Sequence, residues 1–270
     1  MRAQALFRIM LTLCLTLFAT RFSSPNFDSI KPFSTFVASE ATQGVAADSS
    51  FIYAIGNDVV GKYDRKTFAK VESYKSGTDD PLKHMNGGVV VGNKLYCSHS
   101  NYPETPMSSS IEIFDTASLK HIGSQSFGID TGSLVWVDWY QGNWWVCFGH
   151  YNGKGGEPGM KNDRTVLVKF DKDWRRIGGY SFPKEIVERW DGMTCSGGVF
   201  GPDGLIYATG HHAPEIHVLK LPKSGSALEF VKVIPSPVEG QGIAIDTKTK
   251  TIFQMQRKEK AIYLFDMNLF

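Results

Sequence analysis

Apolar and polar positions alternate in short runs along most of this chain, and the runs recur in a fixed order. Each unit opens with small residues and an apolar run, such as TQGVAAD at 42–48, and continues with an aromatic-rich second run. A third run ends at an acidic turn, and a fourth follows. Runs of this length with period-two alternation predict four β-strands in each unit. The openings are marked by Gly44, Gly88, Leu134, Gly198 and Gly242.

These openings predict the blades of a β-propeller. Their intervals are about 45 residues with one longer interval, and a repeat of four strands at that period is typical of propeller blades. The last unit ends without a fourth strand, whereas residues 31–39 alternate like a strand that belongs to no other unit. We therefore predict an all-β, five-bladed propeller closed by an N-terminal strand that completes the last blade. The expected blades span 42–75, 85–128, 132–182, 194–236, and 239–270 together with 31–39.

The N-terminus has the pattern of a secretory signal. Arg2 and Arg8 precede an uncharged apolar run over 9–19, which is too short to span a bilayer as a helix. We interpret residues 1–24 as a signal peptide, cleaved between Ala19 and Ser24, and residues 25–270 as one propeller domain. The expected location is secreted, periplasmic or extracellular, with no stable membrane insertion after cleavage.

Charge and cysteine content narrow the range of partners and cross-links. Lys and Arg number 29 against 27 for Asp and Glu, a net charge of +2, so the basic surface of a nucleic-acid binder is not expected. The domain holds three cysteines, Cys97, Cys147 and Cys195, each inside a predicted strand. An odd number in such positions argues against a disulfide framework. We expect a monomer whose partner is a small polar molecule or a glycan.

Histidines gather where propeller geometry converges. The start of the first strand and the end of the second strand of each blade emerge on the same face of the ring, around its channel. Neutral imidazoles bind divalent transition metals such as zinc, and three of them with an open position activate water. The predicted metal ligands are His84, His99, His150 and His211. His212 is expected to point away from its neighbour, because adjacent strand residues alternate.

Two other interpretations of this rim stay open. In the first, a histidine near neutral pKa acts without metal beside a carboxylate from Glu215, Glu239 or Asp191. In the second, side-chain amides hydrogen-bond a polar ligand over an apolar floor. The amide candidates are Gln43, Asn86, Asn101, Asn152 and Gln241. The long insertions 101–109 and 151–163 lie on the same face, where binding loops are usual.

Several motifs resemble known propellers. The openings at Gly44 and Gly242 and the DGLIY segment at 203–207 resemble secreted β-propellers of the NHL and YncE-like type. The start at Thr42, Gln43 and Gly44 and the five-blade length are also similar to plant-type glutamine cyclotransferases, although the later blades lack the acidic and Trp-containing segments of that family. The first resemblance implies a scaffold rather than an activity, and the second implies a glutaminyl cyclase.

The sequence therefore favours a secreted propeller with a His-rich pocket for a small ligand, acting as a metal-dependent hydrolase or lyase. The alternative is a non-catalytic module that binds a protein or a glycan. A tryptophan group could stack on a sugar, although core packing is the competing interpretation. Its members are Trp136, Trp139, Trp144 and Trp145.

Overall fold

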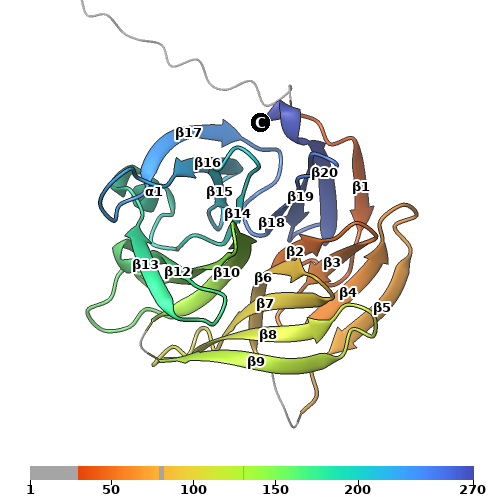
Figure 1. The fold of residues 1–270 in the computed structure, drawn as a ribbon, viewed down its shortest axis with the longest axis horizontal. Coiled ribbons are helices and arrows are strands. Elements are labelled where there is room, and N and C mark those ends of the chain that lie inside the picture. Colours follow the sequence, from red (N-terminus) through yellow and green to blue (C-terminus); the bar gives the residue numbers. More distant parts are fainter. Residues whose placement is uncertain (1–29, 79–81, 130) are drawn as a thin grey trace, which may run out of the picture.

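The chain folds into a ring of five four-stranded antiparallel sheets, as the sequence predicts (Figure 1). The computed structural model describes residues 30–78, 82–129 and 131–270. The predicted signal peptide and its cleavage position lie outside these residues. No helix among the described residues is long and apolar enough to cross a membrane.

Each sheet follows the chain from the innermost strand outward, which is the order expected of a blade. The first contains β2 (Gly44–Ala47), β3 (Phe51–Ile55), β4 (Val59–Asp64) and β5 (Lys70–Lys75). The second contains β6 (His84–Val91), β7 (Lys94–Ser100), β8 (Ser109–Asp115) and β9 (His121–Gly128). The third contains β10 (Ser133–Tyr140), β11 (Asn143–Gly149), β12 (Val166–Phe170) and β13 (Arg176–Ser181). The fourth contains β14 (Gly197–Phe200), β15 (Ile206–Thr209), β16 (Glu215–Lys220) and β17 (Glu229–Pro235).

The fifth sheet joins the two ends of the chain. It contains β18 (Ile243–Asp246), β19 (Thr251–Gln256), β20 (Ala261–Asp266) and, as its outermost strand, β1 (Ser34–Val37). Strand β1 pairs antiparallel with β20, from Ser34 opposite Leu264 to Val37 opposite Ala261. The predicted ring closure is therefore confirmed.

The five innermost strands surround a channel that side chains nearly fill. They neighbour one another in the order β2, β6, β10, β14, β18 and back to β2. A small cavity of about 40 Å³ lies between them, lined by residues of all five strands, including Val89 and Asp138.

The tryptophan group of the third blade is mainly core. Trp136, Trp144 and Trp145 are buried, and Trp139 packs edge-on against Trp144. Cys97, Cys147 and Cys195 are buried free thiols, as expected for a fold held together by packing. The tryptophans therefore offer no exposed platform for a sugar.

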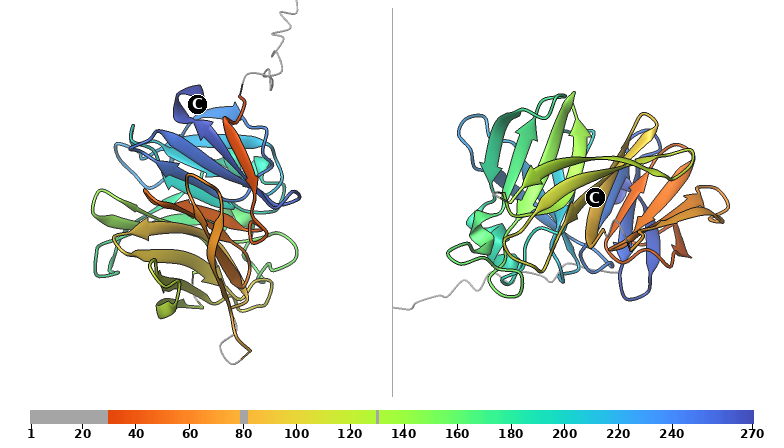
Figure 2. Two further views of the ribbon diagram at one scale, coloured as in Figure 1. Left: turned by 90° about the vertical axis from the view of Figure 1, so that its right-hand side faces the viewer. Right: turned by 90° about the horizontal axis from the view of Figure 1, so that it is seen from below.

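Short helices lie between the strands. Helix α1 (Lys184–Arg189) buries Ile186 against the core between blades three and four. Among the described residues there are also two 3₁₀ turns, η2 (Asn162–Arg164) before β12 and η3 (Met267–Leu269) after β20. Asn152 N–H donates to the Gly192 carbonyl at 2.9 Å, so the loop after β11 is joined to the segment after α1. Figure 2 shows α1 and this loop on the same face of the ring.

Candidate functional site

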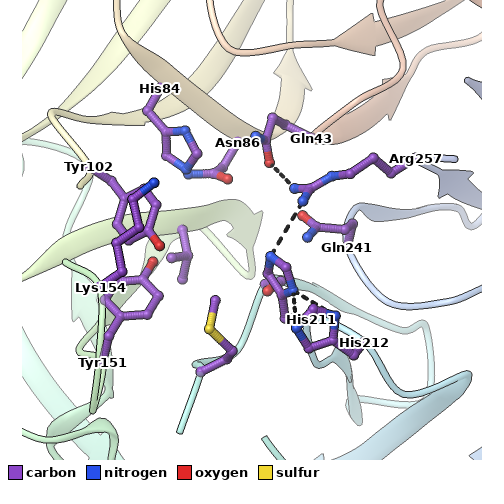
Figure 3. A pocket seen from close by; sticks show the side chains of 13 residues that line it. Gln43, His84, Asn86, Tyr102, Tyr151, Lys154, His211, His212, Gln241 and Arg257 are labelled. Carbon is purple, nitrogen blue, oxygen red and sulfur yellow. Dashed lines mark hydrogen bonds between the residues drawn. The ribbon is translucent and has the colours of Figure 1, made fainter. Parts of the chain in front are cut away.

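A pocket of about 380 Å³ opens at the channel mouth on the face that carries the long loops (Figure 3). Its walls come from the starts of the first strands and from the segments after the second strands. Such a volume lies within the about 300–1,000 Å³ of small-molecule sites. The first-strand group is Gln43, His84, Asn86, Val135, Met193, Ser196 and Gln241. The second group is Tyr102, Tyr151, Lys154, His211, His212 and Arg257.

Arg257 is the central cation of the pocket. It follows β19, and its Nε donates to the Thr42 carbonyl at 2.8 Å while Nη2 donates to Gln43 Oε1 at 2.7 Å. The contact of Nη1 with His211 Nε2 is longer, 3.4 Å. Each terminal nitrogen carries a second hydrogen beyond the one used in these contacts. The guanidinium is thus held in place by the protein and still has N–H groups to offer a ligand.

No described carboxylate pairs with Arg257, and none lines the pocket. Burial lowers the pKa of the Arg257 guanidinium, and the neighbouring Tyr102 partly offsets this decrease. An arginine with a lowered pKa is still charged at neutral pH. A half-buried cation without a counter-ion makes the pocket electropositive, and an anionic ligand would supply the missing charge.

Gln241 presents a second unused donor. Its side chain is 3% exposed, and its Nε2 is buried with no hydrogen-bond partner among the described residues. Its backbone has a φ of 73°, in the left-handed region that residues other than glycine rarely adopt. Buried amides are normally hydrogen-bonded, and strained backbone gathers at functional sites. Both features point to a ligand that accepts a hydrogen bond from Gln241.

Two histidines of the pocket, His84 and His211, are neutral at neutral pH. Burial, followed by the charges of Arg257 and His99, lowers the pKa of His84 from 6.5 to about 4. Burial, followed by Arg257, His212 and His84, lowers the pKa of His211 to about 4. Each imidazole therefore offers one donor and one acceptor nitrogen at neutral pH, and neither adds positive charge.

The wall opposite Arg257 is aromatic. The rings of Tyr102 and Tyr151 lie 4.8 Å apart between centroids, and Tyr102 lies 4.9 Å from His84. Burial raises the pKa of both phenols, so both keep their protons at neutral pH. Figure 3 shows Lys154 beside these tyrosines, across the pocket from Arg257 and Gln241. One side of the site thus carries the hydrogen-bond donors of Arg257 and Gln241, and the opposite side carries the two tyrosine rings and a second cation, Lys154.

Two of the four predicted metal ligands, His84 and His211, line this pocket, and the other two do not. His99 accepts the Lys83 N–H at Nε2, 3.0 Å, and contacts Ser110 Oγ at 3.0 Å through Nδ1. His150 is buried, with Nδ1 3.9 Å from Glu157. Within the described ranges no group of three or more His, Cys, Asp or Glu side chains could hold a metal ion. The metal centre therefore stays a prediction for which the structure assembles no ligand group.

The predicted acids lie outside the pocket lining. Glu215 contacts His217 at 2.9 Å and Arg189 at 3.1 Å. The hydrogen bond with His217 is the main reason why the pKa of the Glu215 carboxyl group is lowered. Glu239 pairs with Lys258 at 2.8 Å, and Asp191 is exposed. A carboxylate beside a pocket histidine is therefore not formed by these residues.

The amide predictions divide in the same way. Gln43, Asn86 and Gln241 line the pocket. Asn101 instead braces its own loop, accepting the Ser108 N–H at 2.8 Å and donating to the Pro106 carbonyl at 3.0 Å. Asn152 accepts the Asn162 N–H at 2.9 Å. Three of the five amides thus surround the cavity, and two hold the loops that enclose it.

Arg257 and the aromatic wall were not predicted from the sequence, and His212 does not point away from the pocket as predicted. His211 and His212 form a bend rather than a strand, so strand alternation does not apply and both line the pocket. Arg257 occupies the position after the second strand of blade five that His150 occupies in blade three. A search of that repeat position for any polar residue, rather than for histidine, would have found it.

No protein-family model matches the chain, and no curated protein matches it. Many solved structures share the fold. Glutaminyl cyclase of Myxococcus xanthus is 11% identical, with 86% of this chain and 94% of that chain covered and a TM-score of 0.57. Hydrazine synthase of Kuenenia stuttgartiensis is 11% identical, with 84% and 71% covered and a TM-score of 0.49. At these identities the likeness to glutaminyl cyclase shows the five-bladed fold and no activity.

Proposed function

We propose that this propeller binds a small organic anion in the pocket at its channel mouth. The observation that carries the proposal is the unpaired guanidinium of Arg257 beside the unpartnered, buried amide of Gln241. Both groups donate, and none of the lining residues that the structure describes is acidic. Among common ligand groups, a carboxylate or phosphate oxygen accepts from both donors and supplies the counter-charge.

The aromatic wall favours an organic ligand over a free inorganic ion. Tyr102 and Tyr151 offer apolar ring faces opposite the donors (Figure 3), and Val135 and Met193 add apolar surface to the pocket lining. A ligand with an acidic end and a short carbon body would contact both walls. The proposal requires no metal ion.

The test is calorimetric titration of the purified protein with acetate, butyrate, benzoate and phosphate at constant ionic strength. We expect the organic anions to bind and Arg257→Met to weaken them at least about tenfold, since a charge-assisted hydrogen bond contributes about 1.5–3 kcal/mol. The matched control is Lys258→Met, which removes an exposed neighbouring cation outside the pocket. Equal weakening in both variants, or no binding by the wild type, would contradict the proposal.

Glutaminyl cyclase activity is a separate hypothesis. The shared fold with the Myxococcus xanthus enzyme is its only structural support, and a fold hosts many activities. Release of ammonia from a peptide with an N-terminal glutamine would detect this activity directly.

A further inference from the structure

The pocket carries a second unpaired cation, on the wall opposite Arg257. Lys154 lies in the loop after β11, lines the pocket, and forms no ion pair with any described residue. Two acidic side chains of the loops around the pocket contact other groups instead of Lys154. Glu104 pairs with Lys83 at 2.9 Å, and Glu157 accepts the Met107 N–H at 2.7 Å. Lys154 therefore has no internal counter-ion in these loops.

The loop holds the backbone of Lys154 beside the pocket. Gly155 has a φ of 78°, and a β-carbon at this position would lie 2.4 Å from the ring of Tyr102. Only glycine allows so close an approach in this conformation. Gly156 N–H also donates to the Gly153 carbonyl at 2.8 Å. The backbone next to Lys154 is thus packed against the aromatic wall. This packing holds the backbone of Lys154 at the edge of the pocket that its side chain lines.

We infer that the ligand is an organic dianion with an acidic group at each end of a short carbon body. This inference rests on the proposed function. One acidic group would accept from Arg257 and Gln241, the body would lie against Tyr102 and Tyr151, and the second acidic group would pair with Lys154.

The charge distribution disfavours a zwitterion. An amino acid would place its ammonium group in a pocket that contains Arg257 and Lys154 and has no acidic side chain among its described lining residues. Like charges in a partly buried site repel, and nothing there would compensate the ammonium group. A dianion instead meets one cation on each wall.

The experiment compares diacids with monoacids of the same chain length by calorimetry at constant ionic strength. The pairs are succinate with butyrate, glutarate with pentanoate, and adipate with hexanoate. We expect at least one diacid to bind roughly tenfold or more tightly than its monoacid. Lys154→Met should remove this preference, leaving the diacid about as weak as the monoacid.

The matched control is Lys161→Met, an exposed lysine of the same loop that does not line the pocket; it should preserve the preference. If the wild type bound diacid and monoacid equally tightly, and Arg257→Met bound neither, the ligand would not be a dianion. The proposal that the pocket binds an organic anion would still hold. A preference that survives Lys154→Met would also overturn the dianion. No binding of any acid would overturn both proposals.

Discussion

At the residue scale, Gln241 combines two unfavourable features in one position. Its positive φ costs free energy for any residue with a β-carbon, and its buried amide nitrogen has no partner in the part of the chain that the structure describes. The backbone of Gln241 is held in this conformation by blade four, because its N–H donates to the Gly210 carbonyl at 3.1 Å and its carbonyl accepts from Thr209 Oγ1. Such costs are usual where a side chain serves a ligand, which is why Gln241 stands beside Arg257 in our proposal.

Replacing Gln241 by glycine and by alanine separates the strain from the donor. Both variants lose the amide and should bind the organic anion more weakly. Only alanine keeps the strained β-carbon, so Gln241→Gly should be about 1 kcal/mol more stable than Gln241→Ala. Urea unfolding measures the difference. If the alanine variant were the more stable, the backbone at this position would not be strained.

At the element scale, β1 decides whether the ring is closed. It is short, and one of its faces is buried. The ring of Phe36 stacks on Phe68 with centroids 4.6 Å apart and packs on Tyr63 at 5.3 Å, which joins blade five to blade one. Val37, on the opposite face, is 74% exposed. The strand therefore contributes through one buried side chain and its pairing with β20.

Phe36→Ala should lower the free energy of unfolding by about 3 kcal/mol, because it leaves a cavity between two blades. Val37→Ala, the control on the same strand, should change it by less than about 0.5 kcal/mol. All six tryptophans lie between residues 136 and 190, in blade three and the segment before blade four. If β1 closes a ring that unfolds cooperatively, Phe36→Ala should lower the urea concentration at the midpoint of the tryptophan fluorescence transition, although the tryptophans lie far from β1 in the sequence. An unchanged fluorescence midpoint would mean that β1 frays alone.

At the scale of the whole molecule, the ring brings ionisable groups from distant blades together. His84 comes from blade two, His211 from blade four and Arg257 from blade five. Burial, followed by the positive charge of Arg257, lowers the pKa of both histidines to about 4. In the unfolded chain these groups separate, and the pKa of each histidine returns to about 6.5. Stability should therefore depend on pH.

Between pH 4 and 6.5 the unfolded chain binds protons at His84 and His211 that the folded chain does not bind. Stability should rise with pH across this window. Asp138 has the opposite effect, because burial raises its folded pKa to about 6 and its stabilising contribution is lost as pH rises through that value. The melting temperature of the double variant His84→Gln, His211→Gln should rise less steeply from pH 4.5 to 6.5, and that of Asp138→Asn more steeply. An unchanged slope in the double variant would show that the histidines are not held neutral.

The sequence by itself determined the five-bladed fold and its closure. Strand alternation is a local property with a period of two. The blade repeat occurs five times in the sequence, so each unit supports the assignment of strands in the others. The unmatched run at 31–39 and the missing fourth strand of the last unit predicted β1. These inferences depend on neighbours along the chain, which a sequence shows directly.

Only the tertiary structure decided which rim residues meet and what charge they enclose. His99 and His150 also lie at the ends of second strands, yet neither lines the pocket: His99 accepts the Lys83 N–H, and His150 is buried. The aromatic wall comes from long loops whose path is set by contacts such as that of Gly155 with Tyr102. Loop paths and the absence of a carboxylate near Arg257 depend on packing between blades. No periodicity along the chain encodes that packing, so the anion pocket became visible only in the folded ring.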